Sequence, residues 1–78
     1  MNDKNINKIF RSIVEAAPVS FDYNTTSSGT FRVKGVPTLL RSNKNGSYFL
    51  AVTQPGYGYA TWSLDKAKNI RFSKSIND

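Results

Sequence analysis

The side chains best suited to chemistry in this chain are cations, and they are concentrated in its second part. From residue 30 onward they are Arg32, Lys34, Arg41, Lys44, Lys66, Lys68, Arg71 and Lys74. Only Asp65 and Asp78 oppose them, whereas acidic and basic residues balance before residue 30, so the net charge of +6 belongs to this part. A one-sided basic field favours polyanionic partners such as nucleic acid, nucleotides or an acidic protein face. The alternative interpretation is a solvated surface that only keeps a small protein soluble.

Aromatic residues among these cations suggest how such a partner is held. Tyr57 and Tyr59 flank a glycine at an expected turn, where exposed rings supply stacking surfaces for bases while Lys and Arg meet phosphates. Alternation along a strand predicts that both tyrosines point to the same side, so they are either both buried in the core or both exposed. The predicted binding residues are Arg32, Arg41, Tyr57, Tyr59, Lys66, Lys68 and Arg71, with Lys34 as a further phosphate candidate.

The spacing of the last cations does not by itself predict a continuous basic stripe. Lys68 and Arg71 are three residues apart, and Lys74 follows at the same interval. In a regular strand, residues three apart point to opposite faces of the sheet. The sequence therefore favours a diffuse positive field over a single groove.

Catalysis, a metal site and a cofactor are all disfavoured. The chain has no cysteine and no histidine, which removes the commonest metal ligand and the commonest general base. Its five carboxylates form no pair resembling those of a glycosidase or a metal site. The segment around Gly56 and Gly58 lacks the Lys-Ser/Thr of a phosphate-binding loop. We expect a protein that is not an enzyme. With no apolar run of membrane-spanning length and no secretory signal, we also expect it to be cytoplasmic.

The elements that must position these residues follow from hydrophobic periodicity. One helix is expected over about residues 4–16, ending before Pro18, because apolar residues recur at helical spacing. These residues are Ile6, Ile9, Phe10, Ile13 and Val14. Their stripe is interpreted as core packing, with a detachable partner-binding helix as the alternative.

Beyond Pro18 the period changes to two, which indicates strands. Strands are expected over residues 19–24, 30–33, 38–41, 47–53, 59–63 and 69–74, with a helical turn near residues 64–68. Gly35 and Pro37 indicate a bulge or an exposed edge. We predict an α+β fold: an N-terminal helix followed by a small five- to six-stranded SH3/Sm-like β-barrel over about residues 19–75, in one domain covering residues 1–78.

This order of elements resembles the WYL domain, an Sm-like barrel found in bacterial transcription regulators and phage-defence proteins. The resemblance lies in residues 19–23 (VSFDY), 36–40 (VPTLL), 48–50 (YFL, for the Trp-Tyr-Leu of the name) and 62–67 (WSLDKA). In the last motif Lys66 takes the position of the family's Arg. The resemblance implies a ligand-sensing or nucleic-acid-binding module rather than a catalyst.

Two functions remain open at this level. The first is a non-enzymatic regulatory module that binds nucleic acid or a nucleotide. The second is a small protein of phage or mobile-element type that binds and inhibits or adapts a host protein, with the expected edge at residues 35–37 adding a strand to the partner's sheet. Self-association into a homodimer through edge strands is compatible with either function.

Overall fold

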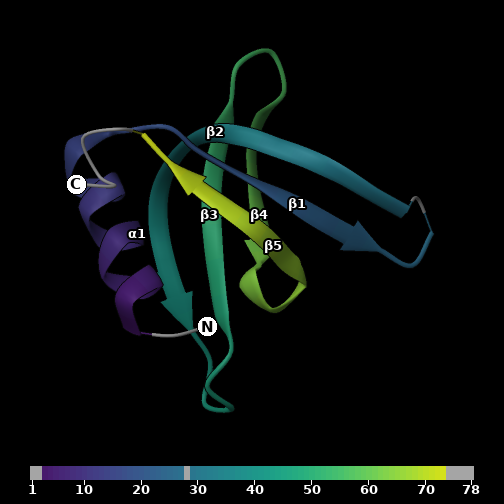
Figure 1. Ribbon diagram of the computed structural model, residues 1–78, viewed down its shortest axis with the longest axis horizontal. Coiled ribbons are helices and arrows are strands. Elements are labelled where there is room, and N and C mark those ends of the chain that lie inside the picture. Colours follow the sequence, from purple (N-terminus) through teal and green to yellow (C-terminus); the bar gives the residue numbers. More distant parts are fainter. Residues whose placement is uncertain (1–2, 28, 74–78) are drawn as a thin grey trace.

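The computed structural model describes residues 3–27 and 29–73 (Figure 1). Its elements are α1 (Asp3–Glu15), β1 (Val19–Thr25), β2 (Gly29–Ser42), β3 (Tyr48–Gln54), β4 (Gly58–Ser63), the 3₁₀ helix η1 (Leu64–Lys66) and β5 (Ala67–Phe72). The predicted helix, helical turn and α+β class are confirmed. The predicted end of the barrel at residue 75, and Lys74 in the last strand, lie outside the described residues. In the described part, no helix has the length and apolar character needed to cross a membrane.

The strands form one antiparallel sheet in the order β4-β3-β2-β1-β5. The strands β4 and β5 follow each other in the chain, yet they lie at opposite edges of the sheet, because η1 carries the chain from one edge to the other. No pairing joins β4 to β5 within the described residues, so the sheet stays open. The predicted closed barrel is therefore not confirmed.

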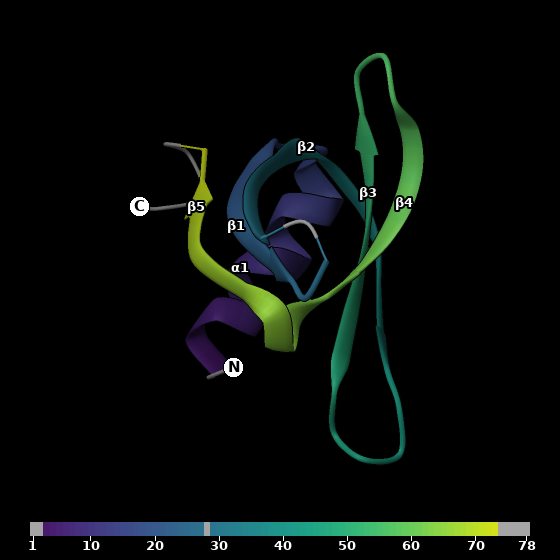
Figure 2. The same ribbon diagram turned by 90° about the vertical axis from the view of Figure 1, so that its right-hand side faces the viewer.

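The strand β2 is the centre of the fold, and it bends. Residues 29–35 pair with β1, and residues 36–42 pair with β3 on the other side (Figures 1 and 2). A Cβ atom on Gly35 would lie 2.4 Å from the carbonyl oxygen of Thr53, so only glycine permits this approach of β2 to β3. The predicted bulge is present between Pro37 and Leu39. The predicted exposed edge is wrong, because Gly35 and Pro37 are both buried inside the sheet.

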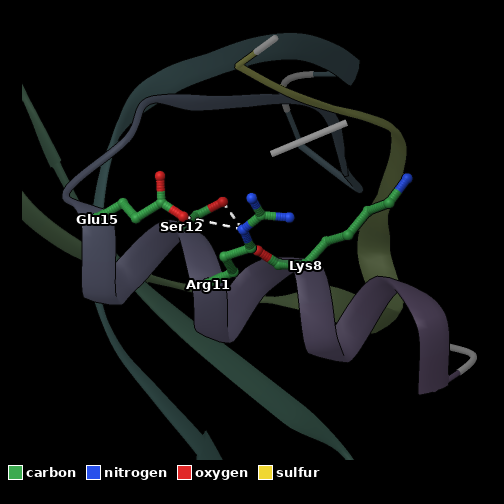
Figure 3. Close-up of polar contacts among 4 residues, drawn as sticks. All are labelled: Lys8, Arg11, Ser12 and Glu15. Carbon is green, nitrogen blue, oxygen red and sulfur yellow. Dashed lines mark hydrogen bonds and ion pairs between the residues drawn. The ribbon is translucent and has the colours of Figure 1, made fainter. Parts of the chain in front are cut away.

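The helix α1 contributes to the core with a narrower face than its apolar stripe predicts. Ile9 is fully buried, whereas Phe10 is 51% exposed and Val14 is 83% exposed. The buried face instead includes Ser12, whose hydroxyl donates to the carbonyl oxygen of Lys8 at 2.9 Å (Figure 3). Because this bond satisfies the hydroxyl, the small polar residue can be buried at little cost and lets the helix lie close to the sheet. The helix is thus part of the core rather than detachable.

The remaining core lies between the two halves of the sheet. Phe21 of β1 is fully buried, and its ring lies edge-on to those of Tyr23 and Trp62, each with centroids 6.3 Å apart. Leu50 and Val52 of β3 complete the centre of this cluster. The aromatic contacts between β1 and β4 hold the sheet in its curved form, since each pair adds about 0.5–1.5 kcal/mol beyond area burial.

Candidate nucleic-acid interface

Strand register brings four cations onto one outer face of the sheet. Ser20 of β1 pairs with Lys34 of β2 on one side and with Arg71 of β5 on the other. Two residues further on, Asp22 pairs with Arg32 and with Lys68. Directly paired residues, and residues two apart on one strand, point to the same face. We call this surface the basic face; it consists of Arg32, Lys34, Lys68 and Arg71, which are all exposed.

A bulge in β5 makes this arrangement possible. Three residue steps from Lys68 to Arg71 span only two steps of β1, because the register shifts between Ser20 and Asp22. The extra residue is accommodated at Asn69, whose φ of 54° lies in the left-handed region that Asn tolerates better than most residues. The prediction that Lys68 and Arg71 point to opposite faces is therefore wrong.

Of the residues that the structure describes, Asp22 is the one carboxylate on the basic face, and it is already engaged. Its Oδ1 lies 3.0 Å from Nη2 of Arg32, and its Oδ2 accepts a hydrogen bond of 2.9 Å from the side-chain amide of Asn69. Nη1 of Arg32 also donates to the hydroxyl of Ser20 at 3.2 Å. The two ion-paired side chains are 44% and 26% exposed, so the pair contributes little to stability, but it fixes the orientation of the guanidinium.

The other three cations of this face differ from Arg32 in their surroundings. Of the described residues, none places a carboxylate within ion-pair distance of Lys34, Lys68 or Arg71. Four cations against one carboxylate leave this face with a net charge of +3. Unpaired surface cations held at fixed strand positions are suited to neutralising the phosphates of a polyanion.

Two hollows adjoin the basic face where β2 bends. The first, which we call the cationic hollow, has a volume of about 260 Å³ and is lined by Ser20, Lys34 and Arg71 among others. The second, the apolar hollow, measures about 400 Å³ and is lined by Pro18, Lys34, Gly35, Val36 and Pro55. Pro18 and Lys34 line both hollows, so the two are neighbours.

The two predicted tyrosines, Tyr57 and Tyr59, lie at the end of the molecule where β2 bends. Tyr59 of β4 pairs with Thr53 of β3, which pairs with Val36 of β2, and Val36 is two residues from Lys34. Tyr59 therefore continues the outer face of the sheet, two strand spacings or about 10 Å from Val36. It is 62% exposed, and Tyr57 in the adjoining turn is 86% exposed. The hairpin of β3 and β4 lies beside the bend of β2 in both views (Figures 1 and 2).

Two predicted residues lie outside the strand pairs that define the basic face. Arg41 pairs with Phe49 near the far end of β2, five residues or about 16 Å along the strand from Val36. Lys66 belongs to η1, before β5 begins. Sequence reasoning also overlooked Ser20 and Val36, because their role depends on pairing with distant strands. The one local signal was an Asn inside an expected strand, which indicates a possible bulge.

These features define a helix-and-sheet domain with a basic outer face. No family model matches the sequence, and comparison with the curated proteins gives no match. Among solved structures, the fold is similar to part of Proteasome accessory factor B/C (PafBC) of Arthrobacter aurescens, with a TM-score of 0.73 and 14% sequence identity. The similarity covers 91% of this chain and 11% of PafBC. At this identity the likeness establishes the fold alone.

Proposed function

We propose that the chain is a non-enzymatic regulatory module of the WYL type, and that it binds nucleic acid or a nucleotide through the basic face and the tyrosines beside it. The likeness to a part of PafBC supports the regulatory class, because PafBC is itself a regulator with a WYL domain. The observation that carries the binding function is the strand register, which gathers four cations from β2 and β5 around one engaged carboxylate.

In this proposal the residues have separate tasks. Lys34, Lys68 and Arg71 neutralise phosphates, since none of them has an ion pair within the described part of the chain. Tyr57 and Tyr59 offer ring surfaces on which unpaired bases stack, a contact worth about 1–3 kcal/mol per base. Neither task depends on base sequence. We therefore expect an affinity that depends strongly on salt concentration and little on nucleotide sequence.

The alternative of a protein that inhibits or adapts a host protein has less support. Its expected contact was an exposed edge at residues 35–37, and β2 is paired on both sides of this point, with Gly35 and Pro37 buried. Because Gly35 and Pro37 are buried, a partner strand has no access to the backbone at these two residues.

The test is the salt dependence of binding to a short fluorescent single-stranded oligonucleotide, measured by anisotropy. Three or four phosphate contacts predict a slope of log K against log salt of about −2 to −3, at about −0.7 per contact. Lys68→Gln should reduce this slope by about 0.7. The matched control is Lys44→Gln, which removes the same charge from an exposed loop away from the basic face.

Two results would overturn the proposal. One is the absence of binding at low salt. The other is an equal loss of affinity in Lys68→Gln and Lys44→Gln, which would mean that only the total charge matters. A pull-down from host lysate supplies an independent contrast: a single stoichiometric protein that survives nuclease, with no nucleic acid recovered, would favour the protein-binding alternative.

A further inference from the structure

We propose that the cationic and apolar hollows form one bipartite site for a nucleotide that ends in a phosphate monoester. The phosphate would lie in the cationic hollow and the base in the apolar hollow. This inference rests on the proposed function and goes further, because it distinguishes the end of a strand, or a free mononucleotide, from the phosphodiester backbone.

The cationic hollow presents donors from three adjacent strands. Lys34 and Arg71 reach it from the strands on either side of Ser20, with which both are paired. The hydroxyl oxygen of Ser20 accepts a hydrogen bond from Nη1 of Arg32 at 3.2 Å. Its own proton is therefore left to donate to a ligand oxygen. Among residues 3–27 and 29–73, the lining of this hollow includes no acidic residue.

The charge in this hollow matches a terminal phosphate better than an internal one. A phosphate monoester carries about −1.5 to −2 charges near neutral pH and offers three strong acceptor oxygens. A phosphodiester carries a single negative charge, which one cation neutralises. Lys34 and Arg71 lie together at one hollow, and within the described residues neither has a carboxylate partner. Two converging cations and a hydroxyl donor thus favour the monoester.

The apolar hollow adjoins the cationic hollow, but its lining is mostly apolar. Apart from Lys34, which it shares with the cationic hollow, its lining has no polar side chain: Pro18, Gly35, Val36 and Pro55. A concave, mostly apolar surface beside a few fixed polar groups is the usual form of a small-ligand site. The volumes of about 260 and 400 Å³ are of the order found in small-ligand pockets.

The position of the apolar hollow depends on Gly35, which lines it and allows β2 to approach β3 closely. The bend of β2 brings Val36 beside the end of β3, where Pro55 begins the turn to β4. Pro18 precedes β1 on the other side. Residues 34–36 of the pocket wall therefore belong to β2, whereas Pro18 and Pro55 are each the residue next to a strand of the sheet.

The ligand class is tested by isothermal titration with three probes: a nucleoside 5′-monophosphate, the same nucleoside without phosphate, and ribose 5-phosphate. The monophosphate should bind at least about tenfold more tightly than either fragment, because each fragment fills one hollow only. Short oligonucleotides with a 5′-phosphate, a 3′-phosphate or only hydroxyl ends separate a strand end from a free mononucleotide. If oligonucleotides with a phosphorylated end bind more tightly than those with only hydroxyl ends, the ligand is the end of a strand. If only the monophosphate binds, the ligand is a free nucleotide.

Variants assign the two hollows. Lys34→Gln should weaken monophosphate binding by at least about tenfold, as expected for a lost charge-assisted hydrogen bond. Val36→Asn should weaken the monophosphate but leave ribose 5-phosphate unchanged, since it alters only the apolar hollow. The matched control is Lys44→Gln, which removes a charge from the exposed turn between β2 and β3, outside both hollows, and should change monophosphate affinity by less than about twofold. Circular dichroism confirms that each variant is folded.

The outcomes separate this inference from the proposed function. If hydroxyl-ended and phosphorylated oligonucleotides bind equally, and Lys34→Gln and Lys68→Gln weaken them equally, the bipartite site is overturned while the proposed function stands. If the monophosphate binds and oligonucleotides do not, the site stands and the proposed function is restricted to nucleotides. If no probe binds, both are overturned.

Discussion

Replacing Gly35 by alanine tests the geometry on which both the fold and the candidate site depend. A Cβ atom at this position would lie 2.4 Å from the carbonyl oxygen of Thr53 and 2.7 Å from Cγ1 of Val52. The first neighbour is backbone of a paired strand, so it cannot turn aside as a side chain can. Relief requires that β2 and β3 move apart at the bend, where β2 changes its pairing from β1 to β3.

The expected cost is that of overpacking a buried position. Such insertions cost about 1–3 kcal/mol. Alanine recovers about 0.4–1 kcal/mol by restricting the unfolded chain, which still leaves a net destabilisation of roughly 1–2 kcal/mol. For a domain of this size, each kcal/mol lowers the melting temperature by about 4–8 °C. We therefore expect Gly35→Ala to melt about 5–15 °C below the wild type.

Thermal unfolding followed by circular dichroism measures this shift, with Gly46→Ala as the control. Gly46 has a φ of +86°, and an added Cβ would meet no atom within 4 Å. Its replacement therefore introduces backbone strain of about 1–2 kcal/mol without a steric contact. Crystallography or NMR of Gly35→Ala should show β2 displaced from β3. A Gly35→Ala variant that melts at or above the wild-type temperature would refute the close approach of the two strands.

Two further predictions concern the charge of the interface and the orientation of the helix. Asp22→Asn releases Arg32 and raises the net charge of the basic face, so oligonucleotide affinity and its salt slope should both increase in anisotropy titrations, at a stability cost below about 1 kcal/mol. Ile9→Ala should cost about 2–5 kcal/mol in urea unfolding, because Ile9 is fully buried, whereas Phe10→Ala should cost much less. Similar losses at both positions would contradict the observed orientation of α1.

The helix, the strand that follows it and the helical turn could be predicted from the sequence, because each depends on the spacing of residues within its own segment. The change from helical to alternating spacing at Pro18 located the boundary between α1 and β1, and the helical turn expected near residues 64–68 is η1, at Leu64 to Lys66. The orientation of α1 was not accessible. Phe10 fits the apolar stripe better than Ser12 does, yet Ser12 is buried, because its hydroxyl is satisfied within the helix.

The candidate site was accessible only in part, because residue type is a local property and register is not. Lys68 and Arg71 were chosen for their charge, but the face that they share depends on the left-handed Asn69 and on pairing with Ser20 and Asp22, nearly fifty residues earlier. No spacing rule within one strand contains that information. The same argument explains why Arg41 was chosen although it lies elsewhere.

The distribution of engaged and unengaged cations also indicates which side of the molecule a polyanion would approach. On α1, Arg11 bonds Glu15 at 2.9 Å, and Nζ of Lys8 lies 5.8 Å from the centroid of the Phe72 ring (Figure 3 shows both cations). These two helix cations are occupied by contacts within the fold, whereas Lys34 and Arg71 have no ion pair with any residue that the structure describes. Since a positive charge without an internal partner attracts an external anion most strongly, the approach should be from the basic face rather than from the helix.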